Sequence, residues 1–282
     1  MGSYGVPRLA IPPFVGWDIT ADFPFFLTTG KKYVKLSVSG GINALRRTSN
    51  ITRYFPMRMR KKHNLEERIA ACSDVMLYMQ NQNEHANDPL DDSLFYDSQK
   101  VFGNNNPTHL EIGCGKGGFV LEIARQNPDI NYVAIEKTPN VLITGMEKLK
   151  ELKLPNVRFC LGQAEYLDHL FRPHSVDRLY LNFSCPFPKE TYARHRLTHT
   201  RFLKIYNIVL KEGAEIHQKT DNRRLFEFSV EHFSQNGFAM KNVSVDLHNS
   251  GFEGNIMTEY EKRFTDMGMP IYRIEAINPA ER

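Results

Sequence analysis

The segment Asp177–Thr198 combines the residue types that an active-site turn requires. The apolar stretch Leu179–Phe183 predicts a buried strand, and the sequence Ser-Cys-Pro-Phe-Pro that follows predicts a rigid turn. Open α/β folds bind ligands at the carboxyl ends of their strands, where such a turn presents its side chains. The basic and aromatic residues beyond the turn suit a polyanionic substrate, and a solvated helix face is the alternative. Cys185 lies in the turn, and the side chain at this position decides which activity the turn can support.

The glycine-rich stretch Leu110–Phe119 is a second candidate site. Glycines between a strand and a helix allow a tight turn and let a ligand approach the backbone closely. The spacing also fits a dinucleotide-binding turn, or a turn with only a structural role. Glu111 favours S-adenosylmethionine, because its carboxylate at the end of the strand can meet the cationic amino-acid end of that cofactor. The candidate binding residues here are Glu111, Gly113, Gly115 and Gly117.

Two further positions are suited to contact a nucleoside cofactor. Glu136 closes the predicted strand Tyr132–Ile135, where a carboxylate accepts hydrogen bonds from both ribose hydroxyls. NAD enzymes share this position, so Glu136 indicates a nucleoside without choosing the cofactor, and a helix-capping acid is the alternative. Gln163 follows the predicted strand Val157–Cys160, and its amide can form hydrogen bonds with adenine.

These candidates lie between strands and helices that alternate from residue 108 onwards. Such alternation predicts an α/β fold with a doubly wound, mostly parallel sheet. We expect seven strands, with the last two forming an antiparallel edge hairpin. The expected helices are Phe119–Gln126, Pro139–Leu152, Thr198–Leu210 and Asn222–Gln235. The expected strands are His109–Ile112, Tyr132–Ile135, Val157–Cys160, Arg178–Phe183, Glu215–Gln218, Ala239–Leu247 and Ile271–Ile277.

Composition divides the 282-residue chain into three parts. Residues 1–56 carry seven Lys or Arg and two Asp without sustained periodicity, which predicts a basic, poorly ordered extension. Residues 57–107 are expected to form an N-terminal segment with an Asn/Asp-rich linker, and residues 108–282 the cofactor-binding domain. The net charge is +4, so residues 57–282 sum to −1, and any binding of nucleic acid must use local basic patches.

Cysteine usage and hydropathy indicate the compartment. The four cysteines are scattered without a Cys-x-x-Cys pair, which indicates reduced thiols rather than disulfides or a zinc site. No apolar run reaches the ~20 residues of a membrane span, and the N-terminus lacks the pattern of a secretory signal. We therefore expect a cytoplasmic protein without metal or membrane contacts, either a monomer or a homodimer.

An ordered series of motifs runs from about residue 57 to residue 276: LEIGCGKGGF, the acid Glu136, LYLNFSCPFPK, RHRLT, EIHQKTDNRRLFEFS and LHNSGFEGNIMTEYEKRF. In this series the chain resembles the bacterial TrmB family of tRNA (guanine-N7-)-methyltransferases. The resemblance implies a class I methyltransferase fold and S-adenosylmethionine as the methyl donor. The substrate that it implies is a guanine in the variable loop of tRNA.

The resemblance also implies roles for single residues. Glu111 and Glu136 match the family's cofactor-binding acids, and Thr258 and Glu261 match its T-x-x-E pair around the target guanine. Substrate binding is implied for Lys189, Asp221, Thr258 and Glu261. Contact with RNA is implied for Thr191, Tyr192, Arg194, His195 and Arg196.

The chain departs from the family pattern at three positions. Cys185 stands where the family usually has a catalytic aspartate, Phe187 where it has tryptophan, and Gln163 where it has an acid. The resemblance implies both a catalytic and a cofactor-binding role for the position of Cys185. Guanine N7 carries a lone pair and no proton, so its methylation needs no general base, and we expect activity to be retained. A weakened or inactive tRNA-binding homologue is the alternative. An NAD-dependent oxidoreductase is disfavoured, because no second domain with a hydride-transfer site is visible.

Overall fold

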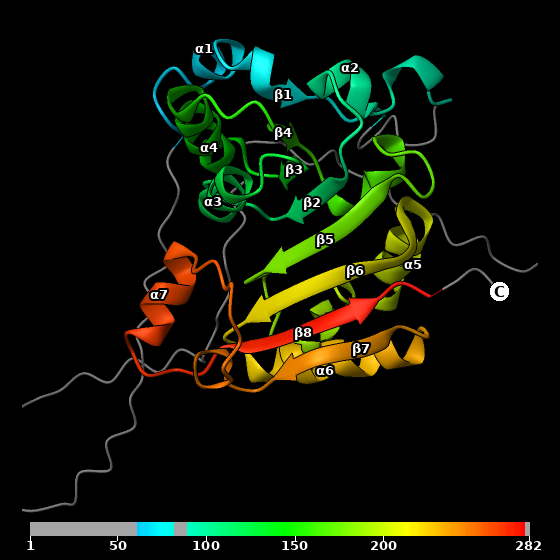
Figure 1. The fold of residues 1–282 in the computed structure, drawn as a ribbon, viewed down its shortest axis with the longest axis vertical. Coiled ribbons are helices and arrows are strands. Elements are labelled where there is room, and N and C mark those ends of the chain that lie inside the picture. The colour runs from blue at the N-terminus through cyan, green and yellow to red at the C-terminus, as the bar shows by residue number, and fades with distance from the viewer. Residues whose placement is uncertain (1–60, 82–88, 280–282) are drawn as a thin grey trace, which may run out of the picture. The chain divides into compact units, whose positions relative to one another are not determined.

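A sheet of eight strands forms the centre of the part of the chain that the computed structural model describes, residues 61–81 and 89–279 (Figure 1). These residues belong to one compact unit, Lys61–Arg282. The strand order is β1-β4-β3-β2-β5-β6-β8-β7. The strands are β1 Met76–Leu77, β2 Thr108–Ile112, β3 Asn131–Glu136, β4 Val157–Leu161, β5 Val176–Asn182, β6 Leu210–Thr220, β7 Ala239–Ser244 and β8 Tyr272–Ile277.

The sheet is parallel from β1 to β6, β8 runs in the opposite direction, and β7 at the edge again runs in the direction of β6. β8 lies between β6 and β7 and pairs antiparallel with both. The predicted α/β sheet with an antiparallel edge is confirmed, but the expected number of seven strands is wrong. The additional strand is β1, in which Met76 pairs with Phe159 and Leu77 with Cys160 of β4. Two residues carry too little alternation to be recognised as a strand in the sequence.

Helices cover the two faces of the sheet with two hydrophobic cores. On one face α3 and α4 pack over β2, β3 and β4, and α5 and α6 lie on the other face (Figure 1). Successive residues of a strand point to opposite faces, so Leu110 belongs to the core under α5 and α6, and Tyr132 and Phe159 to the core under α3 and α4. The helices are α1 Leu65–Ala70, α2 Ser98–Phe102, α3 Gly118–Gln126, α4 Pro139–Leu152, α5 Thr200–Val209, α6 Arg223–Gln235 and α7 Glu259–Thr265.

Local sequence explains why α3, α4 and α6 begin where they do. Gly117 precedes α3 with a φ of 76°, and Pro139 occupies the first turn of α4. Asn222 caps α6 by accepting a hydrogen bond from the amide of Leu225, at 2.9 Å. Each of these helices follows a parallel strand directly, so their N-termini gather at the carboxyl edge of the sheet with the loops that join them to the strands.

The structure differs from the prediction in several local elements. β6 begins at Leu210 rather than Glu215, and the short helix α7 was not expected. The predicted linker contains α2 and the 3-10 helix Asp92–Leu94. Asp91 and Asp97 cap these two helices, so the acidic residues that indicated a loop are helix caps.

The outer segments of the chain are described only in part. Leu65 and Cys72, in the region expected to be an N-terminal segment, pack into the core under α3 and α4. The expectation for residues 1–56 lies outside the described residues, so the predicted division into three parts stays a prediction. Within the described ranges, no helix is long and apolar enough to cross a membrane.

Candidate active site at the carboxyl edge

The glycine loop follows β2 and leaves space above its backbone. Gly113 and Gly115 have φ values of 79° and 59°, which side-chain-bearing residues rarely adopt. A Cβ atom at either position would meet nothing within 4 Å. At Gly117 a Cβ atom would lie 2.8 Å from Cζ of Phe159. Gly113 and Gly115 therefore border open space that a ligand can occupy, whereas Gly117 is required for packing against β4.

Glu111 lies directly before the glycine loop, and its carboxylate is buried. The residue is 3% exposed, and its Oε1 accepts a hydrogen bond of 3.0 Å from Nδ2 of Asn182. Its Oε2 makes no hydrogen bond among the described residues. Burial raises the pKa of Glu111 to about 7, against the opposing effects of the Asn182 hydrogen bond and the Lys219 charge. A buried carboxylate oxygen without a donor is suited to a cationic group from a ligand.

Glu136, at the end of β3, reaches over the glycine loop. Its Oε2 accepts a hydrogen bond of 3.3 Å from the amide of Gly115, and its Oε1 accepts one of 2.9 Å from the amide of Thr138. The backbone carbonyl of Glu136 also accepts a bond of 3.2 Å from the amide of Gly162, next to the half-buried Gln163. The structure thus brings the three predicted cofactor-binding loops together at one edge of the sheet.

The turn after β5 has a strained backbone and a buried arginine behind it. Phe183 and Phe187 have φ values of 51° and 40°. Arg196 is only 4% exposed, and its guanidinium donates to the carbonyls of Pro186 and Phe187 at 3.1 Å each. It also donates to Oε1 of Glu190 at 2.9 Å. The buried guanidinium of Arg196 therefore stabilises the turn. The sequence led us to expect a contact with RNA at this residue instead.

Cys185 is half-buried in this turn. Burial raises the pKa of its thiol, so the side chain is neutral near pH 7 and lacks the charge of an aspartate.

The other predicted RNA-contacting residues are exposed. Lys189 precedes the 3-10 helix Glu190–His195, which carries Thr191, Tyr192, Arg194 and His195. The ring of His195 packs against Phe187, with 5.7 Å between ring centroids, and against Tyr192, with 6.2 Å. Lys189 and the exposed residues of this 3-10 helix form a basic and aromatic strip, which is anchored to the turn through His195 and faces solvent.

Asp221 follows β6 and is half-buried beside the start of α6, with a pKa that burial raises. Thr258 and Glu261 form a capping box at the start of α7. The amide of Glu261 donates to Oγ1 of Thr258 at 2.9 Å. Glu261 is fully buried, and its Oε1 accepts a bond of 2.6 Å from Nδ2 of Asn255. The expected direct contact of Glu261 with the substrate is therefore not open in this structure.

Lys219 is the functional candidate that sequence reasoning missed. Its ammonium donates to Oε2 of Glu261 at 2.7 Å, so the two side chains form a buried ion pair between the end of β6 and α7. The sequence contained a clue to this pair. If Glu261 is buried, its carboxylate requires a cationic partner. The Lys in Lys-Thr-Asp-Asn, at the end of a predicted strand, was the available one.

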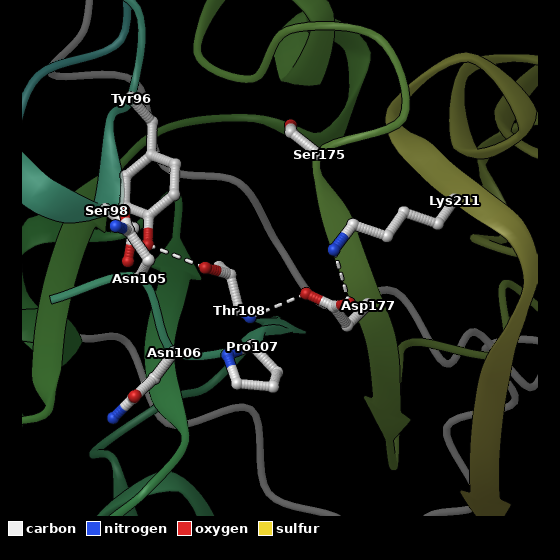
Figure 2. A pocket seen from close by; sticks show the side chains of 9 residues that line it. All are labelled: Tyr96, Ser98, Asn105, Asn106, Pro107, Thr108, Ser175, Asp177 and Lys211. Atoms are coloured by element: carbon white, nitrogen blue, oxygen red, sulfur yellow. Dashed lines mark hydrogen bonds and ion pairs between the residues drawn. The ribbon is translucent and has the colours of Figure 1, made fainter.

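A shallow hollow at the opposite edge of the sheet is not a competing site (Figure 2). It measures about 240 Å³ and lies at the amino ends of β2 and β5. Four of its lining side chains are already paired: the hydroxyl of Tyr96 bonds to Oγ1 of Thr108 at 2.7 Å, and Asp177 accepts from Nζ of Lys211 at 2.6 Å (Figure 2).

One group of three side chains within the described ranges has ligand atoms close enough to hold a metal ion, namely Glu215, His217 and Glu275. The carboxylates are already paired with Arg178, Lys241 and Arg273. These cations compete with a metal ion for the same oxygens, and the expectation that the protein binds no metal stays a prediction.

The strand order, the glycine loop and the acids at the ends of β2 and β3 define the fold of class I methyltransferases. Residues 105–274 match the family model described as putative methyltransferase. Among solved structures, that of the 16S rRNA methyltransferase KamB superposes with a TM-score of 0.50 at 17% identity, covering 68% of this chain and 95% of that one.

Sequence identity to named relatives is higher. The tRNA (guanine-N(7)-)-methyltransferase of Bacillus subtilis (strain 168) is 45% identical over 219 residues, which cover 78% of this chain and 98% of the relative. That of Geobacillus sp. (strain WCH70) is 44% identical over 223 residues, covering 79% and 96%. The chain belongs to the TrmB family of tRNA (guanine-N(7)-)-methyltransferases.

Proposed function

We propose that this protein transfers a methyl group from S-adenosylmethionine to N7 of a guanine in the variable loop of tRNA. The observation that carries the proposal is the carboxyl edge of the sheet. There the open glycine loop lies on one side with Oε2 of Glu111, which has no hydrogen-bond partner among the described residues, and an exposed basic strip lies on the other. Relatives at 44–45% identity carry the same activity in their names.

The residues at the glycine loop fit the proposed cofactor. Oε2 of Glu111 offers an acceptor for an ammonium group, and Gly113 and Gly115 leave room beside the backbone. The carboxylate of Glu136 can accept hydrogen bonds from ribose hydroxyls, and the amide of Gln163 can form hydrogen bonds with adenine. When bound, S-adenosylmethionine supplies an electrophilic methyl group on a sulfonium. The protein must bind it, orient it and exclude water.

The chemistry at guanine requires positioning rather than proton transfer. N7 carries an in-plane lone pair, so the reaction depends on an in-line approach in a desolvated site. Asp221 is half-buried at the carboxyl edge, and its carboxylate can accept hydrogen bonds from the Watson–Crick edge of a flipped guanine. Thr258 and Lys189 complete the proposed substrate side. The neutral thiol of Cys185 can contact the base or the cofactor, but it orients them less strongly than a carboxylate would.

The exposed basic and aromatic strip can bind the polyanionic tRNA. Lys189 and Arg194 can pair with phosphates, and Tyr192 and His195 can stack on bases or riboses. Arg196 is left out of this set because its guanidinium is occupied within the turn. A cytoplasmic location, where tRNA is available, remains our prediction.

The test is methyl transfer from labelled S-adenosylmethionine to unmodified tRNA, followed by digestion and identification of the modified nucleoside. We expect 7-methylguanosine in the variable loop. A product at another base, or no product with folded protein, would refute the proposal. Binding of tRNA without turnover, with activity restored by Cys185→Asp, would instead identify an inactive homologue.

A further inference from the structure

Lys219 is buried at the end of β6 and has a complete set of acceptors. The residue is 6% exposed. Its ammonium donates to Oε2 of Glu261 at 2.7 Å, to the carbonyl of Ile256 at 2.8 Å and to Oδ1 of Asn255 at 3.0 Å. An ammonium has three protons, so all of its hydrogen-bonding capacity is directed at α7 and the segment before it.

Lys219 also faces the cofactor side of the site. Its Nζ lies 5.5 Å from the ring centroid of Phe119, the second residue of α3, which begins at the glycine loop. Asn182, which donates to Glu111, is the register partner of Lys219 on the neighbouring strand β5. One side chain thus touches the helix of the glycine loop and the elements that carry Thr258.

Few apolar contacts attach α7 to the sheet. Phe264 of α7 forms a small hydrophobic cluster with Leu247 and Ile271, and Phe183 of the β5 turn packs against this cluster. Burying a lysine and a glutamate costs desolvation that their attraction only partly offsets, so such a pair adds little to stability compared with apolar residues. The contribution of Lys219 is geometric instead. Its three hydrogen bonds to Asn255, Ile256 and Glu261 fix the position of residues 255–261 relative to β6.

We propose that Lys219 is a positioning residue that fixes α7 and residues 255–258 against the carboxyl edge, so that the guanine side and the cofactor side of the site keep one geometry. This inference rests on the proposed function. Under this inference, Glu261 binds Lys219 and caps α7 without contacting the substrate. The guanine is held by Asp221 and Thr258.

The central variant is Lys219→Met, which removes the charge and shortens the unbranched side chain by only one atom. The segment 255–265 should loosen, and its amide hydrogens should exchange roughly 10-fold or more faster than in the parent protein. We expect kcat/KM for tRNA to fall by roughly 100-fold, as misplacement by about 1 Å can do. Lys219→Arg should recover most of the loss. Lys211→Met is the matched control, because Lys211 lies on the same strand, exposed and paired with Asp177.

A second readout separates positioning from a loss of stability. Glu111 is surrounded by Asn182, Glu136, the Val120 amide and the Lys219 charge, and Lys219 in turn faces Glu261 and Arg273. Removing the charge of Lys219 should raise the pKa of Glu111 further. The pH at which S-adenosylmethionine affinity reaches half its plateau should therefore move upward in Lys219→Met and stay in place in Lys219→Arg and in Lys211→Met.

The outcomes distinguish this inference from the proposed function. Amide exchange is measured on the protein alone, so a parent protein that methylates no tRNA would refute the function and leave this test intact. A folded Lys219→Met protein with parental exchange in residues 255–265, and with tRNA kcat/KM within about 3-fold of the parent, would overturn the inference. If Lys219→Met does not fold, Glu261→Gln removes the partner's charge, and unchanged exchange in that variant would overturn it as well.

Discussion

The cofactor side and the substrate side of the carboxyl edge are built in different ways. On the cofactor side, loops directly after β2, β3 and β4 meet through backbone groups, such as the amide of Gly113 on the carbonyl of Ile135 and the amide of Gly162 on the carbonyl of Glu136. On the substrate side, the β5 turn and α7 are held by two buried cations, Arg196 and Lys219. The first geometry follows from the strands themselves, whereas the second depends on single side chains. We therefore expect single substitutions to affect the two sides differently.

Glu111→Gln should give the largest effect on the cofactor side. It removes the charge that we expect to pair with the cofactor's ammonium, and loss of a buried charge partner costs about 2–5 kcal/mol, or roughly 30-fold or more in affinity. Calorimetric titration with S-adenosylmethionine measures this loss. Glu122→Gln, on the outer side of α3 and paired with Arg125, should bind like the parent protein. Equal affinities of the two variants would contradict the assignment of Glu111.

Arg196→Met should give the largest effect on the stability of the substrate side. It leaves the carbonyls of Pro186 and Phe187 without their buried donor, which should cost about 2–4 kcal/mol in the free energy of unfolding. Denaturant unfolding measures this change. The substitution should also lower methyl transfer while leaving cofactor affinity near its parental value. A parental unfolding midpoint would show that the turn does not need this arginine.

The pH dependence of cofactor affinity should separate the two sides further. The pKa of Glu111 is raised to about 7, and its ionised form is the one that attracts an ammonium group. Affinity should thus be on a plateau above pH 7 and fall about 10-fold per unit below it, where Glu111 is protonated. Affinity for tRNA should not follow this titration. A flat cofactor profile between pH 6 and 8 would mean that Glu111 does not meet the cofactor's charge.

Arg194→Ala should have a smaller effect, confined to RNA binding. The side chain is exposed on the strip, so the free energy of unfolding should change by less than about 0.5 kcal/mol. The KM for tRNA should rise several-fold, and the salt dependence of binding should weaken by about one phosphate contact. An unchanged salt dependence would place the RNA elsewhere.

Cys185→Asp should have the smallest effect. Because N7 methylation needs no general base, the parent protein should already turn over, and a carboxylate should raise kcat/KM by less than about 10-fold. Cys185→Ser is the matched control, since it keeps the size and neutrality of the side chain. A much larger gain with aspartate would show that the thiol had weakened catalysis.

The two sides also differ in how far the sequence predicted them. The glycine loop, Glu111 and Glu136 are local patterns next to apolar strands, and the parallel core that carries them was confirmed. The pairing of Lys219 with Glu261 joins residues 42 positions apart, and no local pattern shows it. The sequence does not show that Arg196 points inward, because a basic run has the same composition whether or not one member does so. α7 has only seven residues, too few for a helical period to show.

The position of β8 has a consequence for synthesis of the protein. Among the described strands β8 comes last in sequence, yet it lies between β6 and β7 in the sheet. Until residues 272–277 have left the ribosome, β6 has a bare edge and β7 has no partner in the sheet. A nascent chain can therefore form the cofactor side from β1 to β5 early, but β6 and β7 complete their pairing only after β8 has been synthesised. Cofactor binding should appear during translation before methylation of tRNA becomes possible.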